Sequence, residues 1–365
     1  MNGDRLFLRP DKWIDKGYSF THYNGKPTFL RGGIPGIEAY FTIEKETKHL
    51  IFASNYDAKS DCFAFPICGG CSYRHIPYEE EIILKLNELS RSIHYEKEKI
   101  KIIQASPINY RNNVQWKIGK KQKIGFFKSF SHDIVDLKEI GCNNLAELIK
   151  IPPSILKNSK SIELEFRLNN DSYIDYSKHE TILKTNHGSI IIPKNGFMQT
   201  NQYLIEPWLN LIYTLLQYNS NVLELYSGSG TIGLYCREKI SSLYGFEFSN
   251  SAVDTSKINS KNLNVPHFNY FKFDLNSNFP TLELNKCEIW IMNPPRSGLS
   301  NPVVNAIKKF KPAQIIYSSC DAMTFARDKK RIIEMNPNYR IKNLYLIDFF
   351  PRTPHYEVLA EFIKN

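Results

Sequence analysis

The 365-residue chain contains no long apolar run, and no stretch approaches the roughly 18 consecutive apolar residues that a membrane-spanning helix needs. Its first residues, MNGDRLFLRPDKW, are charged and lack the apolar core of a secretion signal. The chain also shows no internal repeat and no low-complexity segment. These absences predict a cytoplasmic protein that contacts no membrane.

Positive charge, in contrast, is in excess. Lys and Arg number 47 and Asp and Glu 37, which gives a formal net charge of +10. Such an excess favours an anionic partner such as nucleic acid, although it bears on association and not on the fold. Hydrophobic residues make up 42% of the chain, which is enough for a substantial core. The length predicts two or three domains, and we expect a monomer.

The apolar pattern changes twice along the chain. Residues 1–60 have the short apolar runs and Gly-Pro turn signals of strands. Residues 78–104 contain strong helix formers without Gly or Pro, which predicts a helix, and strand-like patterns return between 105 and 195. From 197 onward, short apolar strands alternate with helical stretches, and this alternation predicts a parallel sheet wrapped by helices.

A glycine-rich turn lies within this last region. The segment VLELYSGSGTIGLY places Gly228 and Gly230 after a predicted strand and before a predicted helix, where the backbone can approach a ligand. Glu247 ends the next strand, 21 residues after Tyr226, at a position from which an acid can hold ribose hydroxyls, and Asp274 ends the strand after that. The pattern fits NAD or S-adenosylmethionine, and a tight turn without a ligand is the simpler alternative.

The fourth strand ends in NPPRSGL, a stiff proline turn that presents Asn293. Together with six further segments, this turn makes nearly the whole chain resemble the RNA 5-methyluridine (m5U) methyltransferase family, and in particular its iron–sulfur-containing 23S rRNA type. The segments that carry the resemblance occur in the family's order: DCFAFPICGGCSY, NGFMQTNQ, ELYSGSGT, GFE, NPPRSGL, YSSCDAMTFARD and DFFPRTPHYE.

The resemblance implies an α/β Rossmann-like, S-adenosylmethionine-dependent methyltransferase domain in residues 196–365. It also implies an OB- or TRAM-like β-barrel that binds RNA in residues 1–60, and a mixed α+β central region with an iron–sulfur cluster in residues 61–195. The methyl acceptor would be a uridine in structured RNA. We expect 23S rRNA, with tRNA as the alternative.

The family's catalytic cysteine falls on Cys320 and its general base on Glu357. Carbon 5 of uracil is a poor nucleophile until a thiolate adds to carbon 6, and a carboxylate must later remove the carbon-5 proton. A core thiol and a surface acid are the simpler alternatives for these two residues. The cofactor-binding residues implied by the family and by the glycine-rich turn are Gln199, Tyr226, Gly228, Glu247, Asp274 and Asn293.

Three positions depart from the family's pattern. Asn293 replaces the usual Asp before Pro-Pro-Arg, so an amide stands where the family has a charge. Asp321-Ala322 stands where Asn-Pro is commoner, and Ser227 replaces a frequent cysteine. Because of Asn293, an RNA-binding relative that has lost catalysis is one rival interpretation. A DNA or small-molecule methyltransferase is a second, which the pair of Cys320 and Glu357 disfavours.

Three other cysteines, Cys62, Cys68 and Cys71, are spaced C-x5-C-x2-C around Gly69-Gly70. Thiolates in such a cluster suit an iron–sulfur centre or another soft metal. The family resemblance supplies Cys142 as the fourth ligand and a [4Fe-4S] cluster as the bound group. Zinc and no metal at all remain the alternatives.

Two regions are candidates for RNA contact beyond the catalytic domain. In residues 1–60, the aromatic side chains Phe29, Tyr40 and Phe41 are suited to stacking on bases, and filling the barrel is their alternative role. Residues 119–130, GKKQKIGFFKSF, form a basic predicted hairpin with aromatic residues. A target uridine in folded RNA must be flipped out of its stack to meet Cys320.

Overall fold

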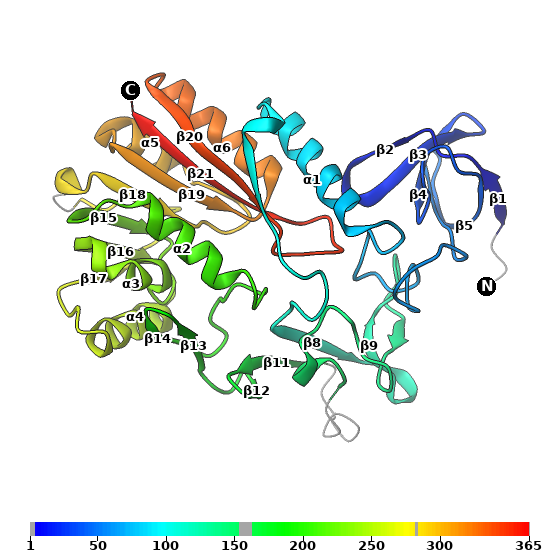
Figure 1. Cartoon of the computed structure of the whole chain (residues 1–365), viewed down its shortest axis with the longest axis horizontal. Coiled ribbons are helices and arrows are strands. Elements are labelled where there is room, and N and C mark those ends of the chain that lie inside the picture. Colours follow the sequence, from blue (N-terminus) through cyan, green and yellow to red (C-terminus); the bar gives the residue numbers. More distant parts are fainter. Residues whose placement is uncertain (1–3, 153–162, 282–283, 365) are drawn as a thin grey trace. The chain divides into compact units, whose positions relative to one another are not determined.

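The computed structural model describes residues 4–152, 163–281 and 284–364 (Figure 1). Contacts divide the chain into two compact units, each made of several segments. The first comprises residues 1–88, 107–165 and 350–355, and the second comprises residues 89–106, 166–349 and 356–365. The division into three domains stays a prediction, and residues 1–3, 153–162, 282–283 and 365 of those domains lie outside the described part.

The first unit begins with a six-stranded sheet in the order β1-β5-β6-β4-β3-β2. Only β4 and β6 pair in parallel, and the other neighbours are antiparallel. Leu30, Phe41, Ile51 and Ala53 form its core. Phe41 is fully buried, so of the two roles left open for it the structure supports filling the core and not stacking on RNA bases. The strands are β1 Arg5–Leu8, β2 Lys12–Trp13, β3 Tyr18–Tyr23, β4 Lys26–Arg31, β5 Ala39–Glu46 and β6 Ile51–Ser54.

The predicted helix over 78–104 is only partly confirmed. α1 spans Tyr78–Ile93 and ends where His94 takes a left-handed backbone conformation (φ +49°). The isoleucine-rich end of the predicted helix instead forms β7, Ile100–Ile103, which pairs in parallel with β20. Branched side chains favour an extended backbone, and the available sheet edge decides the outcome here.

The hairpin expected around residues 119–130 is confirmed. β8, Asn113–Ile118, pairs antiparallel with β9, Ile124–Phe127, and β9 pairs with β10, Ile134–Asp136. Two further hairpins follow, β11 Glu163–Asn169 with β12 Ser172–Asp175 and β13 Thr181–Thr185 with β14 Gly188–Ile192. The boundary between the two units falls within β11.

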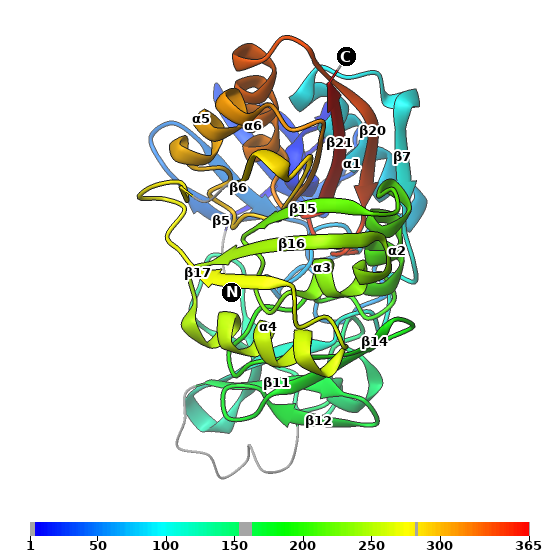
Figure 2. The same ribbon diagram turned by 90° about the vertical axis from the view of Figure 1, so that its left-hand side faces the viewer.

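The second unit is built on an eight-stranded sheet in the order β17-β16-β15-β18-β19-β21-β20-β7 (Figure 2). The strands are β15 Ser220–Leu225, β16 Ile240–Glu247, β17 Asn269–Lys272, β18 Ile289–Met292, β19 Gln314–Ser319, β20 Tyr339–Ile347 and β21 Glu357–Lys364, with β7 at one edge. The expectation of a parallel sheet holds from β17 to β19. It is wrong for β21, which runs antiparallel to both of its neighbours.

Helices lie on both sides of this sheet, with α5 and α6 on one side and α2, α3 and α4 on the other (Figures 1 and 2). They span α2 Ile205–Leu215, α3 Thr231–Tyr235, α4 Asn250–Asn262, α5 Asn301–Phe310 and α6 Ala322–Met335. Their apolar faces cover strands whose residues are buried on both sides, such as β18. Within the described ranges, no helix has the length and apolar character needed to cross a membrane.

Candidate active site and cysteine cluster

The carboxyl ends of β15, β16 and β18 bring three of the predicted cofactor residues side by side. The register pairs Leu225 with Phe246 and with Met292 on either side of β15. The next residues along the three strands are therefore Tyr226, Glu247 and Asn293, which lie next to one another at one edge of the sheet. Open α/β sheets bind ligands at this edge.

The glycine-rich turn has the backbone that a ligand cradle requires. Tyr226 is left-handed at φ +60°, an uncommon conformation for a bulky residue, and Gly228 and Gly230 have φ of +55° and +79°. A Cβ added to Gly228 would meet no atom within 4 Å, so there is open space beside this backbone. The turn thus leaves room for a ligand to approach the main chain.

Glu247 is oriented by two main-chain donors. The Gly228 N–H donates to Oε2 at 3.0 Å, and the Ser249 N–H donates to Oε1 at 2.8 Å. Each carboxylate oxygen can accept a further hydrogen bond, so Glu247 can still hold the hydroxyls of a ribose. These features fit S-adenosylmethionine.

The remaining two predicted cofactor residues lie in connecting segments. Asp274 comes two residues after the end of β17, and its Oδ1 accepts the Asn276 N–H at 2.9 Å in its own turn. Gln199 lies between β14 and α2 and is 6% exposed. The predicted roles of both stay predictions.

A clamp from α6 fixes the loop that carries Arg296. The buried carboxylate of Asp328 accepts the Leu299 N–H at 2.7 Å and the Tyr317 hydroxyl at 2.9 Å. Arg327 donates to the Ser297 carbonyl at 2.7 Å, and the Thr324 hydroxyl donates to the Arg296 carbonyl at 3.0 Å. Side chains from two neighbouring turns of α6 therefore hold the main chain of this loop at residues 296, 297 and 299.

Cys320 and Glu357 meet through the antiparallel pairing of β19 with β21. Ser319 pairs with Val358, so Cys320 lies opposite Glu357 one step further along. Side chains two residues apart share a face of a strand, which places Ser318, Cys320 and Glu357 on the same face. The Ser318 hydroxyl donates to Glu357 Oε1 at 2.5 Å.

Glu357 has the environment of a base poised near neutral pH. Its side chain is 1% exposed, and burial raises its pKa to about 7, while the Ser318 hydrogen bond acts in the opposite direction. Among the described residues, Oε2 has no hydrogen-bond partner. A buried carboxylate with one unsatisfied oxygen is suited to take a proton from a bound substrate.

The pKa of Cys320 is raised, first by burial and then by the charge of Glu357. Arg296 opposes both effects, since its charge and its hydrogen bond to the thiol lower that pKa. Because the α6 clamp holds the Arg296 backbone, this cation is kept beside the thiol. Arg296 is therefore the group that stabilises the thiolate, and it offsets part of the upward shift that burial and Glu357 cause.

The segment before Glu357 is anchored within the first unit by its main chain. The Phe350 carbonyl accepts Lys85 Nζ at 3.3 Å, and the Pro351 carbonyl accepts the Tyr110 hydroxyl at 2.9 Å. Arg352, at φ +67°, accepts the Ser72 N–H on its carbonyl at 2.7 Å. Its own N–H donates to Glu81 Oε1 at 2.7 Å. The three carbonyls that precede Thr353 are all held.

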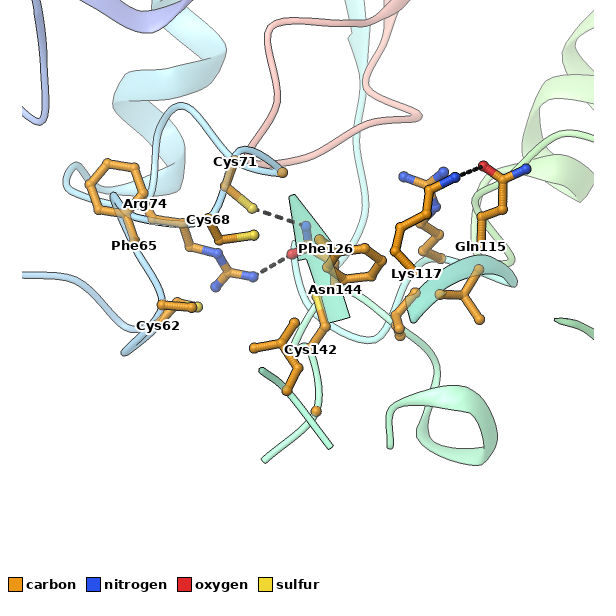
Figure 3. Close-up of a pocket in the computed structure, with 17 residues that line it drawn as sticks. Cys62, Phe65, Cys68, Cys71, Arg74, Gln115, Lys117, Phe126, Cys142 and Asn144 are labelled. Atoms are coloured by element: carbon orange, nitrogen blue, oxygen red, sulfur yellow. Dashed lines mark hydrogen bonds between the residues drawn. The ribbon is translucent and has the colours of Figure 1, made fainter. Parts of the chain in front are cut away.

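The four cysteines predicted to bind a cluster line one cavity of about 240 Å³ in the first unit (Figure 3). Burial raises the pKa of Cys68 to about 11 and that of Cys142 to about 12. Neighbouring thiols add to the shift at both positions. Four thiols in these surroundings favour a cationic guest that stabilises their deprotonated forms.

Three of the four sulfurs receive hydrogen bonds. Asn144 Nδ2 donates to Cys71 Sγ at 3.3 Å, and Arg74 also hydrogen-bonds this sulfur. The main-chain N–H groups of Gly70 and Asn144 donate to Cys68 and Cys142. Donors aimed at sulfur are the usual surroundings of thiolate ligands, and they tune bound iron–sulfur clusters.

The side chains are not gathered as for a single metal ion. Within the part of the chain that the structure describes, no three His, Cys, Asp or Glu side chains are close enough together to hold one. A zinc ion needs all four sulfurs about 2.3 Å from one point. A cluster binds each thiolate to a different iron, so its ligands surround a cavity. The four thiols around the cavity are donors that a cluster could use.

Comparison with known proteins connects these features to a family. Residues 174–363 match the family described as tRNA (uracil-5-)-methyltransferase. An "uncharacterized RNA methyltransferase" of Leptospira interrogans is 34% identical over 400 residues, which cover 99% of this chain and 95% of the relative. The chain belongs to the tRNA (uracil-5-)-methyltransferase family. It is an enzyme, a SAM-dependent RNA (uracil-C5-)-methyltransferase.

Two further relatives place the fold within this family. The 23S rRNA (uracil(1939)-C(5))-methyltransferase RlmD of Mannheimia succiniciproducens is 24% identical, covering 96% of this chain and 94% of its own. The tRNA (uracil-54, C5)-methyltransferase of Pyrococcus abyssi, solved with S-adenosyl-L-homocysteine, superimposes with a TM-score of 0.74 at 20% identity. That likeness covers 98% of this chain and all of the other, and it confirms the methyltransferase fold.

Several residues that shape the sites could not be picked out from sequence patterns. Ser318 looks like any serine in a buried strand, and its contact with Glu357 depends on pairing across 39 residues. Asn144 and Arg352 likewise act through partners far away in the chain. The one local signal was Arg74, which follows the last cysteine of the motif by three residues.

Proposed function

We propose that this enzyme methylates carbon 5 of a specific uridine in structured RNA through a covalent bond between Cys320 and carbon 6. The observation that carries this proposal is the shared face of Cys320, Ser318 and Glu357, with one oxygen of the buried carboxylate unpartnered among the residues that the structure describes. A nucleophile and a base in adjacent positions are what the reaction at uracil requires.

The residues divide the work between them. Arg296 favours the Cys320 thiolate, whose addition to carbon 6 makes carbon 5 nucleophilic. S-adenosylmethionine supplies the methyl group when it is bound, and Tyr226, Glu247 and Asn293 would hold it, with Gln199, Gly228 and Asp274 as further contacts. Glu357 then takes the proton from carbon 5, and the electrons of that C–H bond form the double bond that expels the thiolate.

Two variants separate the nucleophile from the base. Cys320→Ala should abolish both methyl transfer and the covalent RNA adduct. Glu357→Gln should still transfer the methyl group and then accumulate methylated RNA bound to Cys320, visible as a slow band on a denaturing gel. Loss of one positioned base costs about 10²–10⁴-fold in rate, so slow release should remain.

The neighbouring Ser319→Ala serves as the control. Ser319 pairs with Val358 and so lies on the opposite face of β19 from Cys320 and Glu357. Its hydroxyl donates to the Asp321 carbonyl at 3.2 Å and contacts Tyr317. Ser319→Ala should form and resolve the adduct normally. RNA that contains 5-fluorouridine should trap the unmodified enzyme, because fluorine cannot leave as a proton does. An adduct formed by Cys320→Ala would show that another residue is the nucleophile.

We further propose that Cys62, Cys68, Cys71 and Cys142 hold a [4Fe-4S] cluster. The shared cavity and the donors aimed at three sulfurs support this assignment. Protein purified without oxygen should be brown and contain about four irons per chain. A colourless protein with one zinc per chain would exclude the cluster, and Asn144→Ala should alter the absorption spectrum of a cluster by removing a donor to Cys71.

For the substrate we propose 23S rRNA, bound in part by the N-terminal sheet acting as a TRAM-like barrel, with the enzyme acting as a monomer in the cytoplasm. The RlmD relative, which spans almost the whole chain, supports ribosomal RNA. The net charge of +10 supports an RNA partner. Mapping 5-methyluridine in total RNA from cells with and without the gene tests this choice. If the 5-methyluridine that disappears without the gene lies in tRNA, 23S rRNA is not the substrate. If no 5-methyluridine disappears, the result favours the rival interpretation, an RNA-binding relative that has lost catalysis.

A further inference from the structure

Phe130, at the tip between β9 and β10, combines a strained backbone with an exposed ring. Its φ is +54°, a left-handed conformation that is costly for an aromatic residue, and its side chain is 50% exposed. Such outliers concentrate at binding sites.

The Phe130 ring ends a row of aromatic side chains within the first unit. Its centroid lies 5.2 Å from that of Phe52, which stacks on Phe29 at 4.9 Å with 24° between the ring planes. Phe29 contacts Phe20 at 5.8 Å. The row supports Phe130 on one side and leaves half of its surface to solvent.

A cavity of about 480 Å³ lies beside Phe130. Three cationic side chains line it, namely Arg31, Lys117 and Lys128, together with the aromatic rings of Tyr18 and Phe127. Among the described residues that line this cavity, none is Asp or Glu. Arg31 also donates to the Cys68 carbonyl at 2.7 Å, so the cavity wall is tied to the cysteine segment.

Lys128 also pairs with Asp133 at 3.8 Å and Lys117 with Glu163, two acids that do not line the cavity. Aromatic rings and cations in one lining match the chemistry of an unpaired nucleotide. A base stacks on an aromatic face whatever its sequence, and its phosphate seeks a cation. We propose that this cavity, the Phe130 cavity, binds an unpaired nucleotide of the substrate RNA, with the base stacked on Phe130 and the phosphate near Lys128. This inference rests on the proposed function, because it takes RNA as the substrate.

The left-handed backbone makes a clean test possible. Phe130→Gly removes the ring and relieves the strained φ, and this relief offsets the lost contact with Phe52, so the unfolding temperature should change little. Phe130→Trp keeps an aromatic face. Tyr218→Ala serves as the control, because it removes a ring that is 69% exposed. Tyr218 precedes the amino end of β15, whereas the predicted cofactor residues lie at the carboxyl ends of the strands.

Binding is measured with single-stranded oligouridine and with an RNA duplex of equal length. Loss of one base–aromatic stack should weaken oligouridine binding by Phe130→Gly roughly 5- to 150-fold. Phe130→Trp and Tyr218→Ala should bind as the unmodified chain does. Duplex binding should not change, because paired bases cannot stack on the ring. In methylation assays, KM for RNA should rise while kcat at saturating RNA stays the same.

The outcomes separate this inference from the proposed function. If the unmodified chain methylates RNA and Phe130→Gly binds oligouridine equally tightly, the Phe130 cavity is not a nucleotide site. An equal loss of duplex binding would also overturn it, because phosphate contacts alone would then explain the effect. If the unmodified chain binds neither the oligouridine nor the duplex, the result contradicts both the proposed function and the assignment of the Phe130 cavity.

Discussion

The hydrogen bond from Ser318 to Glu357 sets the pH at which the base works, and Ser318→Ala tests this directly. The hydroxyl donates to Oε1 at 2.5 Å and stabilises the ionised carboxylate. A hydrogen bond to a charged group contributes about 1.5–3 kcal/mol, and one pKa unit corresponds to about 1.4 kcal/mol. Removing the bond should raise the pKa of Glu357 from about 7 by about one to two units.

The assay must isolate proton removal from thiolate attack, because the pKa of Cys320 is also perturbed. Adduct is formed at low pH on RNA that carries tritium at carbon 5, and the sample is then shifted to a series of higher pH values. Tritium release reports the action of Glu357 alone, since Cys320 is already bonded. The pH of half-maximal rate should move upward in Ser318→Ala, with the same plateau in strong alkali.

Two controls guard against indirect effects. Ser318 Oγ also accepts the Trp208 indole N–H at 3.2 Å, so Ser318→Ala should cost about 1–3 kcal/mol in the free energy of unfolding. Ser318→Thr keeps a hydroxyl and should restore the original profile, and Ser319→Ala should leave it unchanged. An unshifted midpoint in Ser318→Ala, or a rate lowered equally at every pH, would refute the assignment.

Three further predictions concern stability and binding. Arg352→Met removes one of the two cations beside the fully buried Glu81, which keeps its ion pair with Lys85 at 2.7 Å, and should cost about 1.5–3 kcal/mol in urea unfolding. Lys330→Met, at an exposed ion pair, should cost less than about 1 kcal/mol. The raised pKa of Glu224, about 8 in the folded chain against 4.5 unfolded, means that the folded state binds more protons between these values. The free energy of unfolding of the unmodified chain should therefore fall as pH rises from 5 to 8. In Glu224→Gln this fall should be about 3 kcal/mol smaller, and urea unfolding at pH 5 and pH 8 measures the difference. RNA affinity should fall roughly a thousandfold between 50 and 200 mM salt if six phosphates are contacted, and salt-independent binding in a titration would argue against a phosphate-tracking surface.

The resemblance of short motifs to a known family predicted the enzyme class, because motifs such as NPPRSGL and the glycine-rich turn encode local backbone requirements. Positive φ at Gly228 and Gly230 can be anticipated from residue type alone. The alternation of strands and helices likewise predicted the layered sheet. It did not predict that β21 runs antiparallel, because a strand's direction depends on where its neighbours leave an open edge.

Local patterns failed where a distant partner decided the outcome. The apolar end of the predicted helix 78–104 became β7 because an edge of β20 was available to pair with it. Phe41 was a plausible RNA contact by composition, and packing against Leu30 and Ile51 buried it. Burial and pairing are properties of the assembled fold, and propensity is only a weak guide to them.

By itself, the sequence determined which residues can do chemistry: a thiol, a carboxylate, three clustered cysteines and a basic, aromatic hairpin. Only the tertiary structure decided how they work together. The register of β19 with β21 puts Ser318 and Glu357 on one face, and burial raises the carboxylate's pKa toward neutrality. Both effects arise from groups far apart in the chain, because hydrogen bonding and desolvation act through space and not along the sequence.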